Sequence, residues 1–240
     1  MKGRFNMHLG PRIIYSIGGL NITETVIYAW IVSLVMIAFA LISTRKMSRI
    51  PKGSQGFAEM IVEFIYNLVG NTMGKENLRF APYIGTLFIF LILGNSLGLF
   101  EQRPVTADLN TTFALAGITF VLIHYNAIRS KTLKGYIKHL SEPYPFMLPI
   151  NLVGELAFPL SISFRLFGNI TGGVIIMALL FGGLEGITHG MEITVPFLLI
   201  GIPLPANFFF DVFEAGLQAF IFTMLTMVFI ANGMSHQDQH

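Results

Sequence analysis

The sequence predicts an all-α integral membrane protein. Of the 240 residues, 53% are hydrophobic and only 12% are charged, and the mean hydropathy is +0.67. Soluble domains carry about 25% charged residues, and several apolar runs here reach or exceed the ~20 residues that span a bilayer as a helix. We therefore expect a single membrane domain over residues 1–240, with about five membrane-embedded helices and one amphipathic interfacial helix.

Three spans are predicted in the first half of the chain, at residues 26–42, 81–100 and 112–128. The N-terminal tail, residues 1–25, has no compact apolar segment that ends in small residues, so we expect no cleavable signal peptide. Two loops are strongly basic. The first follows the first span and contains Arg45, Lys46, Arg49 and Lys52; the second follows the third span and contains Arg129, Lys131, Lys134 and Lys138.

The orientation follows from these basic loops. Cytoplasmic loops are enriched in Lys and Arg, whereas the loop at 101–110 has only Arg103 and the loop at 185–192 has neither residue. The distribution predicts that the N-terminus lies outside and the C-terminus lies in the cytoplasm. Lys2, Arg4 and Arg12 in the tail oppose this weakly, because each basic loop contains more positive charge.

Residues 57–70 are predicted to form an amphipathic helix that is too polar to span. Its two faces differ in character, since Glu59, Glu63 and Asn67 lie opposite an apolar face. That apolar face consists of Phe57, Met60, Ile61, Phe64, Ile65 and Leu68. The helix lies at the membrane interface, where it packs either on its own chain or on a partner.

Two long apolar runs follow, at residues 146–184 and 193–232, before a short tail at 233–240. At ~1.5 Å per residue each run would form a helix approaching 60 Å, about twice the ~30 Å hydrocarbon core. Such a helix must tilt, bend or re-enter. We expect steep tilt, because residues 187–190 are the only polar break between the runs.

Four charged residues occur inside these runs. They are Glu155, Arg165, Asp211 and Glu214. A charge near the bilayer centre costs ~2.5 to 3.5 kcal/mol, so each is a functional candidate. Arg165 keeps its charge at any biological pH. A carboxylate at ~4 Å offers ~4 kcal/mol at an effective dielectric of ~20, before desolvation is subtracted. Arg165 thus requires a carboxylate or water nearby, unless it snorkels to an interface.

Polar residues near these charges share their helical faces. Asn169 lies four residues after Arg165. In the last run the polar residues are spaced by four, three and four positions, which gives one stripe: Asn207, Asp211, Glu214 and Gln218. The stripe is either an internal hydrogen-bond seam or the wall of an aqueous ion pathway. Glu155 lies either at the mouth of such a pathway or in a helix contact, and His124 is interpreted as a packing or interfacial residue.

Several classes of function are excluded. The chain has no Cys, so disulfides and cysteine metal sites are ruled out. It contains no phosphate-binding Gly-rich loop and no zinc-binding His-Glu-x-x-His helix. Since these motifs are absent, we expect no catalytic residue, no cofactor and no metal. We also expect no nucleic-acid partner, because the net charge is only +2 and the basic residues cluster in loops.

Four short segments carry a resemblance to a known family. Residues 161–170 read Ser-Ile-Ser-Phe-Arg-Leu-Phe-Gly-Asn-Ile, and residues 213–222 read Phe-Glu-Ala-Gly-Leu-Gln-Ala-Phe-Ile-Phe. Residues 149–155 (Pro-Ile-Asn-Leu-Val-Gly-Glu) and 159–161 (Pro-Leu-Ser) also fit. Together they resemble subunit a of the bacterial F-type ATP synthase, closely so over residues 144–231.

The resemblance implies an ion-translocating stator subunit in a bacterial plasma or inner membrane, neither binding nor hydrolysing nucleotide. Its partners would be a rotating c-subunit ring, the b-subunit peripheral stalk and the rest of the complex. Arg165 would lie between two half-channels and displace the ion from each passing ring carboxylate. Asn169 and Gln218 would flank it, and Asp211 and Glu214 would line a half-channel.

The sequence departs from the family pattern at three positions. Val174 replaces a carboxylate or histidine that many members carry, Phe158 replaces the usual Lys, and Asp211 stands where some relatives have His or Glu. The coupling ion is therefore open between proton and sodium. The two other interpretations are a self-contained ion transporter and a membrane scaffold that anchors a peripheral complex.

Overall fold

A computed structural model describes residues 12–17, 20–45, 47–100, 102–142, 144–190, 201 and 203–234. Within these residues, five helical segments are long and apolar enough to cross a membrane. They are Glu24–Thr44, Lys75–Phe100, Leu109–Lys138, Pro145–Leu184 and Pro203–Met234. The predicted fold class, an all-α multi-pass membrane protein, is confirmed.

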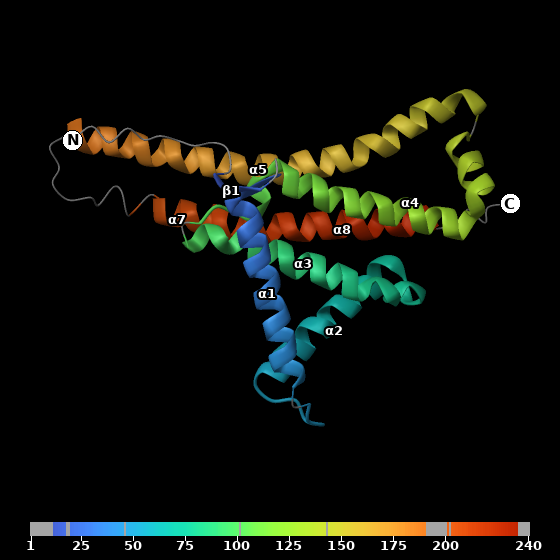
Figure 1. Ribbon diagram of the computed structural model, residues 1–240, viewed down its shortest axis with the longest axis horizontal. Helices are drawn as coiled ribbons and strands as arrows, with labels where there is room; N and C mark the ends of the chain where they lie inside the picture. The colour runs from blue at the N-terminus through green and yellow to red at the C-terminus, as the bar shows by residue number, and fades with distance from the viewer. Residues whose placement is uncertain are drawn as a thin grey trace.

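The chain begins with a small hairpin that the hydropathy pattern does not predict. Strands β1 (Ile13–Ile17) and β2 (Leu20–Thr23) pair antiparallel. They lead directly into α1 (Glu24–Thr44), of which only Thr25, Val32 and Ser43 are buried. Figure 1 shows α1 crossing the other long helices and projecting away from them. Most of its apolar surface is thus available to lipid or to another subunit.

The predicted amphipathic helix is α2 (Ser54–Met73), and its apolar face divides into two parts. Ile65 belongs to a core cluster, and Ile61 and Leu68 pack against that cluster. The remaining apolar side chains of the face are exposed, namely Phe57, Met60 and Phe64. One edge of α2 therefore packs on its own chain, and the other edge is left for lipid or a partner.

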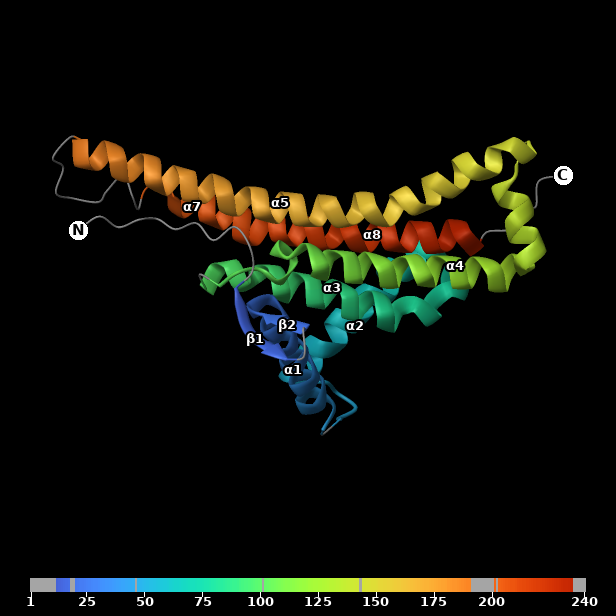
Figure 2. The same cartoon turned by 45° about the horizontal axis from the view of Figure 1, so that its top comes forward.

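Helices α3, α4, α8 and α5 (Leu148–Gly190) run alongside one another (Figure 2), with α4 packed on both α5 and α8 and α3 packed on α8. The core lies among α3 (Ala81–Asn95), α4 (Leu109–Leu140) and α8 (Ala215–Met234), and buried residues of α2 and α5 complete it. Its largest fully buried side chain is Phe222 of α8. The 3₁₀ turns η1 (Lys75–Phe80), η2 (Ser96–Phe100) and η3 (Val105–Ala107) flank α3.

Helix α4 is bent at Thr132, which has backbone angles of φ 60° and ψ 159°. Positive φ is rare for a β-branched residue and breaks the helical path. Beyond the bend, the last part of α4 turns back toward the start of α5 (Figure 1). There the Asn151 side chain donates hydrogen bonds to the carbonyls of Leu140 (2.8 Å) and Glu142 (3.2 Å). This connection joins the ends of the two helices.

Helix α5 (Leu148–Gly190) continues for 43 residues and contains Pro159. The 3₁₀ turn η4 (Pro145–Met147) precedes it. The last part of the chain consists of α7 (Pro203–Phe208), the π-helical segment η5 (Phe209–Glu214) and α8. The beginning of the second predicted long run, residues 193–200, lies outside the described residues.

Candidate ion-translocation site

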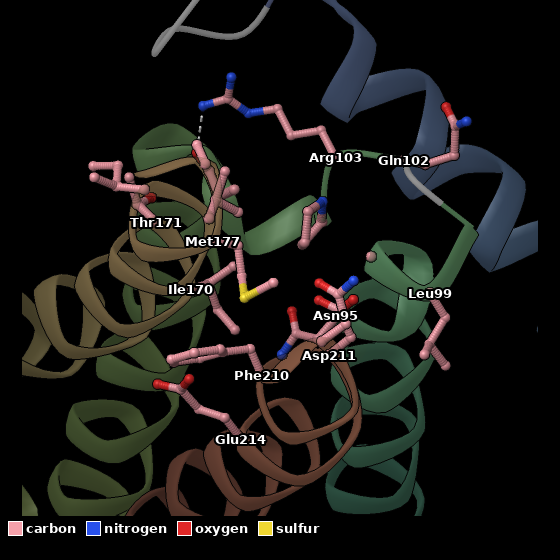
Figure 3. Close-up of a pocket in the computed structure, with 18 of the residues that line it drawn as sticks. Asn95, Leu99, Gln102, Arg103, Ile170, Thr171, Met177, Phe210, Asp211 and Glu214 are labelled. Carbon is pink, nitrogen blue, oxygen red and sulfur yellow. Dashed lines mark hydrogen bonds between the residues drawn. The ribbon is translucent and has the colours of Figure 1, made fainter. Parts of the chain in front are cut away.

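A cavity of about 1030 Å³ lies where α5, α7, η5 and the end of α3 meet. Its α5 wall extends from Ile170 to Phe181. Arg12, Glu24 and Tyr28 contribute to it from the N-terminal hairpin and α1. In Figure 3, Asn95 and Asp211 project into the same part of this space, and Glu214 lies on the other side of the Phe210 ring. The cavity therefore combines the carboxylates of Glu24, Asp211 and Glu214 with two arginines, Arg12 and Arg103, and with neutral polar groups.

Three residues of the predicted polar stripe line this cavity: Asn207, Asp211 and Glu214. Asp211 and Glu214 belong to η5, the π-helical segment. A π-helical turn is wider than an α-helical turn and occurs frequently at functional sites. The wider turn changes the angle between the Asp211 and Glu214 side chains around the helix axis. The α-helical spacing used in the sequence analysis therefore does not predict the directions in which the two carboxylates point.

Asp211 lies directly against the backbone of Gly98 in η2. A Cβ atom placed on Gly98 would be 2.6 Å from Oδ1 of Asp211. Glu214 lies near α5 instead, with Oε2 at 3.6 Å from the position that a Cβ atom on Gly173 would occupy. The two carboxylates thus face opposite walls of the cavity, and the approach of Asp211 depends on the absence of a side chain at Gly98.

Gln218 does not belong to this cavity. Its side chain is 3% exposed, and its Oε1 accepts a hydrogen bond of 2.9 Å from Nδ2 of Asn169. Asn169 lies on the exposed side of α5. The bond joins α5 to α8 and fixes a neutral polar pair one helical turn beyond Arg165. The hydrogen-bond seam interpretation thus describes Gln218, and the pathway interpretation stays a prediction for the three stripe residues that line the cavity.

Arg165 is exposed on α5 and does not line the cavity. Across the described ranges, neither an ion pair nor a hydrogen bond of the Arg165 side chain is found. The carboxylate expected beside Arg165 is thus not supplied by these parts of its own chain. A permanent cation is presented on the outer surface of a helix that is long and apolar enough to span a membrane.

Glu155 lies on the other side of Arg165 along α5, away from the cavity. Its Oε2 is 3.6 Å from Nε2 of His124 on α4. The sequence left its role open between a pathway mouth and a helix contact. The structure gives it a titratable partner, which the interpretation of His124 as a packing residue does not anticipate.

Asn95 is a site residue that the sequence pattern does not single out. It is 1% exposed and lines the cavity. Its Oδ1 accepts a hydrogen bond from Thr106, while its Nδ2 has no partner among the described residues. The sequence offers little evidence that Asn95 lines a cavity, because it is a neutral residue near the end of the uncharged run at 81–100.

The fold and the cavity define a multi-pass membrane protein with water-accessible carboxylates and an exposed arginine among its apolar helices. The sequence model of the family described as ATP synthase A chain matches residues 26–231. The chain belongs to this family. Its relatives include ATP synthase subunit a of Moorella thermoacetica, 39% identical over 226 residues, which are 94% of this chain and 97% of the relative.

Two further relatives extend the comparison. ATP synthase subunit a, sodium ion specific, of Propionigenium modestum is 37% identical over 228 residues, covering 88% of this chain and 74% of the relative. ATP synthase subunit a 1 of Pelobacter propionicus is 33% identical over 216 residues, covering 88% and 87%. The similarity therefore extends over most of each chain.

Proposed function

We propose that this chain is the ion-translocating stator subunit of a rotary F-type ATP synthase, with Arg165 as its central residue. Membership in the ATP synthase A chain family makes it a component of that complex. The observation that carries the proposal for Arg165 is its exposure on α5 without a carboxylate from the described parts of its own chain. A charge at such a position requires a partner, and an ion-binding carboxylate of a c-ring subunit supplies one.

The c-ring carboxylates and Arg165 carry opposite charges. A carboxylate that reaches Arg165 loses its bound ion, because the fixed cation takes the place of that ion. The arginine transfers no proton, since its guanidinium stays protonated, so it also blocks direct passage between the two half-channels. Asn169 and Gln218 support this face of α5 through their hydrogen bond of 2.9 Å.

The cavity is proposed as one half-channel. Two of its three carboxylates, Asp211 and Glu214, exchange ions with water, and Asn207 and Asn95 add neutral polar groups to the wall. Glu214 reaches the α5 wall at Gly173, next to Val174. It therefore places a carboxylate beside the position where this chain lacks the acidic or histidine side chain of many relatives. Glu155 is proposed to belong to the second half-channel.

The proposed orientation places the N-terminus outside and the C-terminus in the cytoplasm of a bacterial cell membrane. It is supported by the two basic loops, because cytoplasmic loops are enriched in Lys and Arg. The cavity then serves the outer side, and Glu155 serves the cytoplasmic side. The b-subunit stalk is the other proposed partner, and the exposed apolar surfaces of α1 and α2 are available to it.

The test is ATP-driven ion pumping by the assembled complex in inverted vesicles. We expect Arg165→Ala to abolish pumping while the complex still assembles. The matched control is Arg49→Ala, which removes an exposed arginine from the loop between α1 and α2 and is expected to leave pumping unchanged. Normal pumping by Arg165→Ala would instead favour a membrane scaffold.

The same vesicles identify the coupling ion. One relative is named as sodium ion specific, so pumping is measured with and without added sodium. A sodium requirement in the unmodified complex would assign sodium, and pumping without it would assign the proton.

A further inference from the structure

His124 and Glu155 form a titratable pair between α4 and α5, outside the cavity described above. Nε2 of His124 is 3.6 Å from Oε2 of Glu155, and the two side chains are 20% and 34% exposed. Both are therefore partly accessible to water, and neither lines the cavity that contains Asp211 and Glu214.

The hydrogen bond of the other ring nitrogen fixes where protons can lie. Nδ1 of His124 is 2.8 Å from the carbonyl oxygen of Phe120. A carbonyl can only accept, so Nδ1 carries the hydrogen and donates it. A neutral ring then has a bare lone pair on Nε2, which faces a carboxylate oxygen. The Nε2 lone pair and the carboxylate oxygen repel each other, whereas one proton between them makes a hydrogen bond. The pair is therefore a binding site for a single proton.

The surroundings hold the ring in this orientation. The Phe120 ring lies against it, with centroids 3.9 Å apart. Tyr136 contacts its edge at 5.9 Å in a T-shaped arrangement. The bend of α4 at Thr132 brings Tyr136 back to this position, and Tyr136 also interacts electrostatically with Glu155. Among the described residues, Glu155 from α5 and Tyr136 from the end of α4 are the titratable groups found facing His124.

Pro159 adds a further polar group at the same place. Proline has no N–H, and its ring excludes a helical hydrogen bond to the carbonyl four residues earlier. That carbonyl belongs to Glu155. The backbone oxygen of Glu155 therefore lacks the helical hydrogen bond that a residue with an N–H at position 159 would donate to it.

The pair and the cavity lie on opposite sides of Arg165 along α5. Glu155 precedes Arg165 by ten residues, or ~15 Å of helix. The α5 residues that line the cavity all follow Arg165, from Ile170 onward. An arginine that separates two access paths would have this arrangement, with one titratable group or set of groups on each side.

We propose that His124 and Glu155 together form a one-proton station in the cytoplasmic half-channel. The inference rests on the proposed function and names the proton as the ion that this path carries. During ATP-driven pumping, water on the cytoplasmic side gives a proton to the Nε2–Oε2 pair. The pair passes that proton on to the ring carboxylate and returns to its empty state.

The test is the pH dependence of ATP-driven proton uptake by the assembled complex in inverted vesicles, whose outer face is the cytoplasmic side. The external pH is varied between about 5 and 8, where histidine changes its charge. Uptake is expected to fall at the alkaline end as the station empties. In His124→Gln and in Glu155→Gln this fall should move toward acid by about one pH unit, which corresponds to ~1.4 kcal/mol.

Two comparisons separate a proton station from simple packing. The double variant should shift the alkaline fall no further than the larger single shift, because residues that act as a unit are not additive. Tyr125→Phe is the matched control. It alters an exposed ring next to His124 in the chain and is expected to leave the profile unchanged. Assembly is checked by quantifying the ring in each purified complex.

The proposal is overturned by an unshifted profile in His124→Gln, or by a loss of rate that is equal at every pH. Uptake of sodium without any uptake of protons would overturn it as well. None of these results would contradict the stator function, whose own test is the loss of pumping in Arg165→Ala.

Discussion

Asp108 connects three segments of the chain through one buried carboxylate, which is 4% exposed. Oδ1 accepts the backbone N–H of Asn110 (3.0 Å) and so caps the start of α4. Oδ2 accepts the hydroxyl of Thr25 in α1 at 2.6 Å. Loss of a helix cap costs ~0.5–2 kcal/mol, and a buried donor left unsatisfied costs ~1–3 kcal/mol.

We therefore expect Asp108→Ala to lower the thermal stability of the detergent-solubilised complex, with a cost of about 2 kcal/mol. Glu63→Ala, which removes an exposed carboxylate from α2, is the control and should not change the melting temperature. Equal melting temperatures for the two variants would show that the Asp108 contacts contribute nothing to stability.

Single residues of the site differ in how well sequence predicts them. Arg165, Asp211 and Glu214 are visible because a charge in an apolar run is costly and so is rarely present without a reason. Asn95 carries no charge, and neutral polar residues are tolerated in helices. The pairing of His124 with Glu155 depends on how α4 packs against α5, which the sequence pattern does not specify.

At the scale of elements, η2 and η5 approach each other through Gly98. A Cβ atom there would be 2.6 Å from Oδ1 of Asp211. We expect Gly98→Ala to displace this carboxylate and to slow ion pumping by on the order of tenfold, because small displacements of functional groups are costly.

The control is a glycine with open surroundings. A Cβ atom on Gly117 of α4 would meet nothing within 4 Å, so Gly117→Ala should pump at the unmodified rate. Pumping rates are compared in vesicles with equal amounts of assembled complex. Unimpaired pumping by Gly98→Ala would show that the position of Asp211 is not critical.

The elements themselves were only partly predictable. Long helices follow from hydropathy, because an apolar run in lipid must satisfy its own backbone hydrogen bonds. The hairpin of β1 and β2 has a short-range signal, the Gly18-Gly19 pair between two β-prone stretches, but the apolar runs dominate the pattern. The bend at Thr132 and the π-helical turn of η5 arise from packing and have no clear signal in the sequence.

At the scale of the whole molecule, the predicted orientation can be tested by labelling. The chain contains no cysteine, so single cysteines can be introduced without removing any others. We expect a membrane-impermeant maleimide to label Ser16→Cys in intact cells and Ser48→Cys only in inverted vesicles. Both positions are exposed, and the opposite labelling pattern would reverse the orientation.

The number and type of membrane helices could be predicted from sequence, but their arrangement could not. Run lengths distinguish spanning helices from α2, whose Glu59 and Glu63 make it too polar to span. The packing of α4 on α5 and α8, and of α3 on α8, depends on contacts between distant residues. One such contact is the hydrogen bond between Ser163 and Thr112, at 2.8 Å.

The exposed guanidinium of Arg165 has a consequence for the life of a newly made chain. Without the proposed ring partner, an unneutralised charge at this place would cost ~2.5 to 3.5 kcal/mol, equivalent to roughly a hundredfold in an equilibrium constant. We therefore expect a chain without this partner to be less stable in the bilayer and more susceptible to proteolysis. Arg165 would thereby also help to keep the amount of this chain matched to the amount of the proposed ring, because chains without a ring would be degraded.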